Sequence, residues 1–105
     1  MAHQSAERRI AHAVLRLARN TGRRVGHHIE IEVPLLRQDI AELAGTTMFT
    51  VSRFLNDWEA RGIVDASRRR IVVRQLHALT AIAEKAADLK PRQRARTDLA
   101  TPRFQ

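Results

Sequence analysis

The sequence predicts a mainly α fold with a small β component: a winged helix-turn-helix in the order helix, strand, helix, helix, hairpin wing, helix. Residues 37–58 read as two short helices joined at Gly45, and glycine accepts a left-handed turn conformation without strain. Ala41 lies four residues before this glycine and Val51 six residues after it, so a small and an apolar side chain can meet where the two helices cross. Two short β-branched runs separated by arginines follow, which indicates a hairpin.

Length and charge limit the number of domains and the kind of partner. With 105 residues, the chain is expected to form one domain over residues 1–89, followed by a basic, disordered tail over residues 90–105. The net charge is +8, and the tail contributes half of it. A positive excess of this size favours a polyanionic partner.

The composition also excludes several kinds of site. Cysteine is absent, so a disulfide framework, a thiolate zinc site and a cysteine nucleophile are excluded. The chain has no apolar run of about 18 residues and its N-terminus is charged, so we expect a cytoplasmic protein without a membrane span or signal peptide. His27 and His28 are expected in a polar loop, and the histidines lack zinc-binding spacing. The acids on the helix surfaces have no nucleophile beside them, so no metal, cofactor or enzymatic activity is expected.

Hydrophobic periodicity defines the first elements. Residues 7–20 are expected to be helical because apolar side chains recur at i, i+4, i+7 and i+8. Gly22 and Gly26 stop this pattern. Residues 29–33 alternate between apolar residues and glutamate, which predicts a half-buried strand that ends at Pro34.

The helix-turn-helix is expected over about residues 37–61. Its first helix spans about residues 37–44, with an inner face of Ile40, Leu43 and Ala44. Either Thr46 or Thr47 can cap the second helix, because a threonine hydroxyl accepts a hydrogen bond from a free amide of the first turn. That helix is expected over about residues 47–61, with an apolar stripe of Val51, Phe54, Leu55 and Trp58. The two aromatic residues of the stripe are expected to supply the largest burial.

The wing is expected over about residues 63–74. Its strands are residues 63–65 and 71–73, and residues 66–70 form a basic tip with Arg68, Arg69 and Arg70. The tip lacks glycine, so we expect a looser turn or a shifted register. A final helix is expected to place on one face Leu76, Leu79, Ile82, Ala83 and Ala86.

Three segments, RQDIAELAG, TVSRFLNDWEARGIV and RRRIVV, occur in this order and spacing between residues 36 and 73. With them, the chain resembles the DNA-binding domain of the cyclic-AMP receptor protein and fumarate–nitrate regulator (Crp/Fnr) family. The resemblance implies sequence-specific binding of double-stranded DNA as the output domain of a transcriptional regulator. In a full-length regulator it implies a homodimer on a two-fold symmetric site, and RNA polymerase is a candidate further partner.

The family's sensor domain and long dimerisation helix have no counterpart in these residues, so we expect a monomer or weak dimer in isolation. An excised domain and a complete short protein are both compatible with the sequence.

The resemblance also implies roles for individual residues. Contacts to DNA phosphates are implied at the start of each helix and at the wing tip, by Arg37, Gln38, Thr47, Thr50, Arg68, Arg69 and Arg70. Strand alternation places Arg68 and Arg70 on one face and Arg69 on the other, so not all three need to touch DNA. Arg53 matches the family's arginine that reaches a guanine, and base readout is expected from Arg53 with help from Ser52, Phe49 and Met48.

Met48 and Phe49 depart from the family pattern, which often places an arginine and a glutamate there. A carboxylate that reads cytosine is therefore missing, and the preferred DNA site is expected to differ. The two apolar side chains can pack against a thymine methyl group or contact a partner domain. The alternative function is a winged-helix protein-interaction module, or a non-specific nucleic-acid-binding module such as one for double-stranded RNA.

Overall fold

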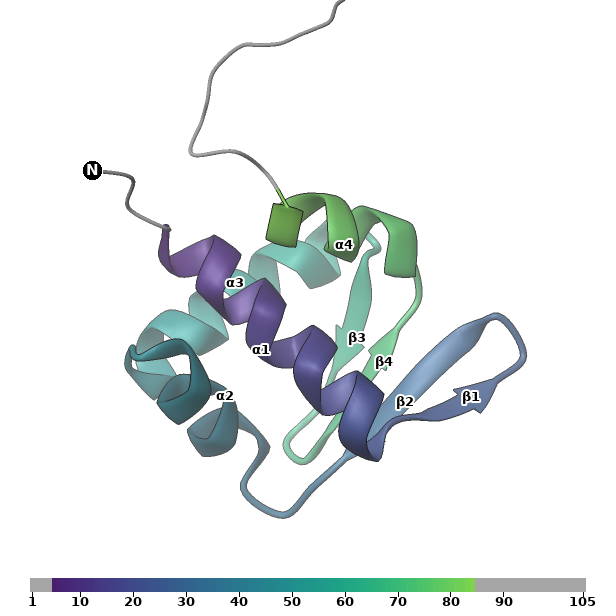
Figure 1. Cartoon of the computed structure of the whole chain (residues 1–105), viewed down its shortest axis with the longest axis horizontal. Coiled ribbons are helices and arrows are strands. Elements are labelled where there is room, and N and C mark those ends of the chain that lie inside the picture. Colours follow the sequence, from purple (N-terminus) through teal and green to yellow (C-terminus); the bar gives the residue numbers. More distant parts are fainter. Residues whose placement is uncertain (1–4, 85–105) are drawn as a thin grey trace, which may run out of the picture.

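The chain folds into four helices and four strands within residues 5–84, the part that the computed structural model describes (Figure 1). The elements follow one another as α1 (Ala6–Thr21), β1 (Arg23–Val25), β2 (His28–Glu32), α2 (Leu36–Ala44), α3 (Met48–Ala60), β3 (Val64–Ala66), β4 (Arg70–Val73) and α4 (Leu76–Glu84). This order confirms the winged helix-turn-helix, with one strand more than expected. The basic tail expected over residues 90–105 lies outside the described residues, as does Ala86 of the final helix.

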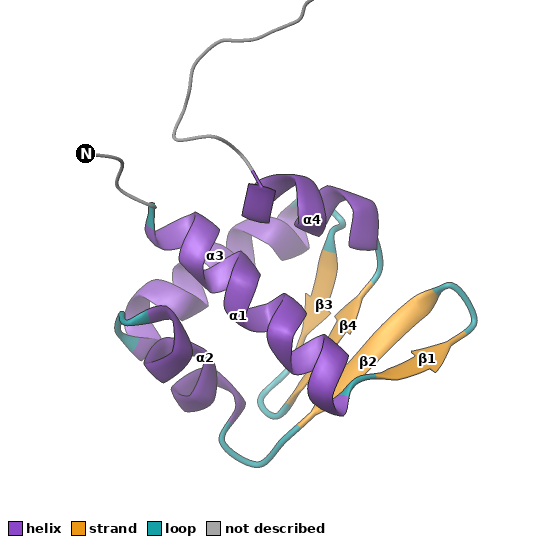
Figure 2. Cartoon of the chain, in the orientation of Figure 1, coloured by secondary structure: helices purple, strands orange, loops and turns teal. Residues whose placement is uncertain are grey.

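The strands form one antiparallel sheet in the order β1-β2-β4-β3. Ile31 stands opposite Ile71, and Val64 stands opposite Val73, and these four side chains are buried on one face. Because side chains alternate along a strand, Glu30 belongs to the opposite, solvent-facing side. Figure 2 shows α1 crossing the middle of the molecule, with α2 on one side, the sheet on the other and α4 at the top. The apolar face of the sheet is thereby closed against helices.

The core is built around α1, which packs against α2, α4 and β2. Ile10 and Val14 of this helix are fully buried. Trp58 of α3 is the largest fully buried side chain, and its burial stabilises the fold by on the order of 2–3 kcal/mol. Phe54 is only partly buried, because its ring lies at the edge of the core beneath Arg53. The expectation that the two aromatic residues supply the largest burial is therefore confirmed for Trp58 and wrong for Phe54.

Strand β1 was missed by the sequence reasoning. It pairs with β2 through a two-residue turn, in which Gly26 takes a positive φ of 63° and Val25 stands opposite His28. His28 therefore belongs to a strand, not to a polar loop. All three residues of β1 are exposed, and a strand that is solvated on both sides carries no apolar alternation by which it could be found.

The inner faces of two helices also differ from expectation. Leu43 of α2 is 45% exposed, and the buried residues of this helix are Leu36, Ile40, Ala41 and Ala44. These lie at i, i+4, i+5 and i+8, so Leu43 falls on the flank of the stripe. In α4, Leu79 and Ala83 are buried whereas Leu76 begins the helix at the surface.

Candidate nucleic-acid interface

The turn between α2 and α3 sets the position of the second helix. Gly45 adopts the left-handed conformation with φ 67° and ψ 41°, and the Thr46 amide donates to the Ala41 carbonyl at 2.9 Å. A Cβ atom added at Gly45 would meet no atom within 4 Å, so only the backbone conformation requires glycine here. Thr47 then caps α3, because its hydroxyl accepts a hydrogen bond from the Thr50 amide at 3.1 Å. Of the two threonines that could have capped the helix, the structure uses Thr47.

The crossing of α2 and α3 determines which face of α3 is presented. Ala41 is only 5% exposed and Val51 is fully buried, and both belong to the core cluster in which α2 packs against α3. Phe49 and Arg53 stand one turn apart on the solvent side, where Phe49 is 75% exposed. Met48, at the start of the helix, is 50% exposed. The exposed face of α3 therefore combines apolar side chains with one long cationic side chain.

Arg53 already has a partner within its own helix. Its guanidinium carbon lies 5.7 Å from the centroid of the Phe54 ring, which is within the range of a cation–π contact. A hollow beside the pair is also lined by Glu7 of α1, by Asn56 and Asp57 of α3, and by Arg61, the residue that follows α3. Arg53 thus stands at the surface with a hydrophobic support and open space next to it.

Arg37, expected to touch phosphate, is a connecting residue in the structure. Its Nε donates to the Ser52 hydroxyl of α3 at 3.2 Å. One terminal nitrogen donates to the carbonyl oxygens of Ser67 at 2.7 Å and Arg68 at 3.4 Å. Arg37 and Ser67 are 30 residues apart in sequence, so no local pattern signals this link. The side chain is half-buried and joins α2, α3 and the turn between β3 and β4.

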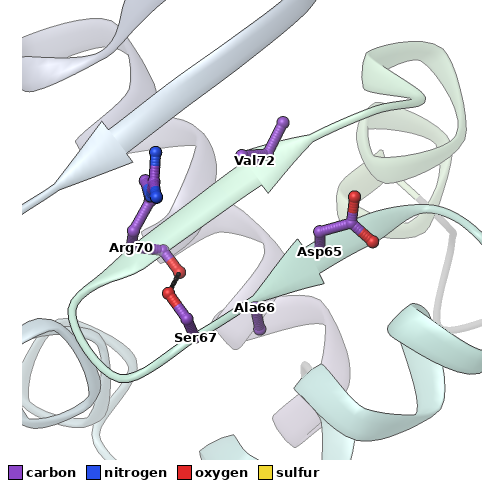
Figure 3. A pocket seen from close by; sticks show the side chains of 5 residues that line it. All are labelled: Asp65, Ala66, Ser67, Arg70 and Val72. Carbon is purple, nitrogen blue, oxygen red and sulfur yellow. Dashed lines mark hydrogen bonds between the residues drawn. The ribbon is translucent and has the colours of Figure 1, made fainter.

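The turn of the wing closes without glycine. The Ser67 amide donates to the Arg70 carbonyl at 2.8 Å, and the Ser67 hydroxyl donates to the same oxygen at 3.3 Å (Figure 3). Ser67 and Arg70 line an open hollow on the wing together with Asp65, Ala66 and Val72. The strands keep a regular register from Val64 opposite Val73 to Ala66 opposite Ile71, so the shifted register is not observed. Serine thus supplies the turn closure that glycine would otherwise favour.

Arg70 lies on strand β4, whereas Arg68 and Arg69 lie in the exposed turn. The Arg70 guanidinium bonds to Glu30 at 2.5 Å, and Glu30 also bonds to Arg23 at 2.6 Å. The hydrogen bond from Arg23, and then that from Arg70, hold the pKa of the Glu30 carboxyl below its ordinary value of 4.5. Glu30 in turn raises the pKa of Arg70. The basic tip is therefore shorter than expected, because Arg70 belongs to β4 and is bonded to Glu30 on the neighbouring strand β2.

Two further arginines serve the fold and were not recognised from the sequence. Arg8 donates to the Ala83 carbonyl of α4 at 3.0 Å. Arg9 donates to the Ala44 carbonyl, the last residue of α2, at 2.8 Å. The bond from Arg9 places a cation at the last carbonyl of α2, where the helix dipole favours positive charge. Part of the positive charge of the chain therefore lies on arginines that join helices within the fold.

The remaining residues expected to contact phosphate lie at the surface around the two helix starts. Gln38 is exposed, and its amide nitrogen lies 3.4 Å from a Glu42 carboxylate oxygen. The hydroxyls of Thr47 and Thr50 bond to each other at 3.1 Å. Within residues 5–84, no three histidine, aspartate or glutamate side chains gather where they could hold a metal ion. The described helices include none that is long and apolar enough to cross a membrane.

Comparison with known proteins agrees with this geometry. The family model of the Crp-like helix-turn-helix domain matches residues 8–82. Nitrogen fixation regulation protein FixK of Azorhizobium caulinodans is 36% identical over 81 residues, which cover 75% of this chain and 33% of that protein. Electron transport regulator A of Shewanella oneidensis is 28% identical over 86 residues, which cover 82% of this chain and 34% of that protein. The similar region thus spans about a third of these two relatives.

Solved structures show the same similarity. Oxidised CprK in complex with o-chlorophenolacetic acid has a TM-score of 0.67 and 32% identity, over 78% of this chain and 35% of that one. The CO-dependent transcription factor CooA of Carboxydothermus hydrogenoformans has a TM-score of 0.68 and 32% identity, over 76% of this chain and 37% of that one.

Proposed function

Because this chain belongs to the Crp-like helix-turn-helix family, the DNA-binding domains of Crp/Fnr transcriptional regulators, we propose that it binds double-stranded DNA sequence-specifically as the output domain of such a regulator. The observation that carries the proposal is the orientation of α3. Its Val51 face is buried in the core, so the exposed side chains of Phe49 and Arg53 point outward, where a groove could receive them. A major groove of B-DNA is wide enough to admit a helix.

Base readout is assigned to the exposed face of α3. Arg53 would donate two hydrogen bonds to O6 and N7 of a guanine, which is the commonest specific contact of arginine. Phe49 and Met48 would meet apolar base surface, for which the thymine methyl group is the candidate in the major groove. Ser52 would contribute a hydroxyl beside them. This combination favours a half-site in which thymine accompanies guanine.

Phosphate binding is assigned to the two sides of α3. Arg68 and Arg69 of the wing turn are exposed, as are Gln38 and Thr47, and Thr50 lies beside them in the first turn of α3. Contacts of this kind position the protein without reading sequence. Arg37 and Arg70 remain candidates, but their guanidinium groups are already bonded within the protein.

The assembly would follow the symmetry of the site. Relatives about three times the length of the matched region carry this domain. In a regulator of that size, we propose a homodimer whose two copies bind half-sites about one helical turn apart. RNA polymerase is the candidate protein partner, and an isolated copy would bind one half-site weakly.

The exposed Met48 and Phe49 also favour a second candidate. Neighbouring apolar side chains on a small surface can dock another protein, and the basic residues would then hold nucleic acid without sequence preference. The two candidates differ in how binding responds to salt, since phosphate contacts weaken with salt whereas a base preference persists.

The deciding experiment is selection from random duplexes at raised salt, followed by sequencing. DNA readout requires enrichment of one sequence that Arg53→Ala loses. Arg24→Ala, which removes an exposed arginine from β1, is the matched control and should keep the preference. If binding and preference disappear together in the parent chain, the docking module becomes the better account.

A further inference from the structure

Arg37 connects the two DNA-facing parts of the molecule. Its hydrogen bonds run to Ser52 on α3 at 3.2 Å and to the Ser67 carbonyl in the wing turn at 2.7 Å. A third and longer contact reaches the Arg68 carbonyl at 3.4 Å. A single side chain thus forms hydrogen bonds to both the proposed base-reading helix and the proposed phosphate-binding turn, in addition to the packing of α3 against β3.

Few other bonds hold the end of the wing. The ladder between β3 and β4 reaches only as far as Ala66 opposite Ile71. Beyond it, the Val33 amide donates to the Arg69 carbonyl at 3.1 Å, and Ser67 closes the turn on Arg70. None of these bonds involves α3. Within the described residues, Arg37 is therefore the hydrogen-bonded link from α3 to the turn.

The chemistry of the link requires arginine. A guanidinium presents donors in a rigid planar fork, so Nε can bond to Ser52 while a terminal nitrogen bonds to the wing. A lysine has one donor centre at the end of a flexible stem. It keeps the charge that a phosphate would need, but it does not reproduce the fork.

We propose that Arg37 is a positioning residue, which holds the wing turn at a fixed distance from α3 so that Arg68 and Arg69 meet the backbone while Arg53 reads its base. The proposal rests on the proposed function for its consequence in DNA binding. The restraint of the wing turn by Arg37 is a property of the protein without DNA, so it can be tested independently of DNA binding. The role differs from the phosphate contact that the family resemblance implies for this residue.

The first test uses hydrogen exchange in the free full chain. Arg37→Ala and Arg37→Lys should both raise the exchange rate of the Ser67 amide, which is bonded to Arg70 at 2.8 Å in the parent. Exchange in α1 should stay as in the parent, which shows that the variants are folded. An unchanged Ser67 rate in both variants would overturn the proposal whether or not the chain reads DNA.

The second test measures the salt dependence of binding to the selected DNA site. Each phosphate contact contributes about 0.9 to the slope of log affinity against log salt. We expect Arg37→Lys to lower the magnitude of this slope by about two units, because the phosphate contacts of Arg68 and Arg69 are lost together. The double variant Arg68→Ala with Arg69→Ala should lower it by the same amount. Adding Arg37→Ala to that double variant should change the slope no further.

The opposite result identifies a direct phosphate contact. In that case Arg37→Lys restores binding, and Arg37→Ala lowers the slope by about one unit in every background. Arg24→Ala, which removes the same charge from the far edge of the sheet, shows how much of the loss is general electrostatics. A parent chain without sequence preference would refute the proposed function, while the exchange rates would still decide the role of Arg37.

Discussion

The indole Nε1 of Trp58 donates a hydrogen bond of 2.9 Å to a carboxylate oxygen of Glu7. Trp58 is fully buried, and its ring N–H therefore depends on a protein partner. The same carboxylate lies 3.8 Å from Arg61. This arrangement fastens the C-terminal half of α3 to the first turn of α1, so the orientation of α3 depends on a residue outside the helix-turn-helix.

Replacing Glu7 with alanine should destabilise the fold by about 1–3 kcal/mol, because the buried indole N–H loses its acceptor. Urea unfolding should show a lower midpoint with an unchanged m-value. Glu59→Ala removes an exposed carboxylate from α3 and should change stability by no more than about 0.5 kcal/mol. Equal midpoints for Glu7→Ala and the parent would mean that the indole is satisfied in another way.

Replacing Ala41 with leucine should overpack the crossing of α2 and α3 and cost about 1–3 kcal/mol. Ala41 is buried against the helix that carries Val51, and a larger side chain would push α3 outward. Thermal melting checks the loss, and Ala60→Leu, at an exposed end of α3, is the matched control. A melt identical to the parent would contradict the helix contact at this register.

Acid should remove the stabilisation provided by Glu30. The folded-state pKa of this carboxyl is lowered by Arg23 and by Arg70, so its contribution is fully present above the unfolded value near 4.5 and is lost as the pH falls through the folded-state pKa. The stability difference between the parent and Glu30→Gln should therefore shrink to nothing at low pH. Urea midpoints across that range measure it, with Glu59→Gln as the exposed control. A difference independent of pH would indicate a packing effect of the substitution.

Replacing Arg53 with alanine and replacing Arg69 with alanine should have different kinds of effect on DNA binding. Loss of Arg53 should cost about 1–3 kcal/mol on the preferred site and much less on random DNA, so specificity falls. Loss of Arg69, which is exposed in the wing turn, should weaken binding to all DNA sequences by similar factors. It should also lower the slope of log affinity against log salt by about one unit. Titrations of both duplexes at several salt concentrations separate the two. Equal weakening of both duplexes by Arg53→Ala would make it a phosphate contact.

Phe49 should read the thymine methyl group. Exchanging the contacted thymine for deoxyuridine removes that methyl, which is worth about 0.8 kcal/mol when buried and corresponds to about fourfold in affinity. Phe49→Ala should bind the two duplexes equally. Leu43→Ala removes an exposed apolar side chain from α2 instead of α3, and this variant should retain the preference for thymine. If Phe49→Ala kept the full discrimination, the methyl group would be read by Met48 or by no apolar residue of α3.

The sequence by itself determined the elements whose signals are local. Gly45 in its left-handed conformation, the burial of the small residue Ala41 and of Val51 on either side of it, and the alternation in β2 follow from spacings of a few residues. Helical and strand periodicity act over that distance, so they can be read along the chain. The order of three segments across residues 36–73 was enough for the family, which the match over residues 8–82 confirms.

The tertiary structure alone decided which charged side chains are bonded within the protein and which face outward. Arg37 reaches the wing over 30 residues, Arg70 meets Glu30 over 40, and Glu7 meets Trp58 over 51. Pairs of this kind depend on the path of the backbone between them, which no periodicity encodes. Exposed β1 was missed for a related reason, since its place in the sheet comes from hydrogen bonds to β2 and not from burial. Spacing therefore located the second helix of the helix-turn-helix, whereas long-range packing determined which arginines support it and which face outward.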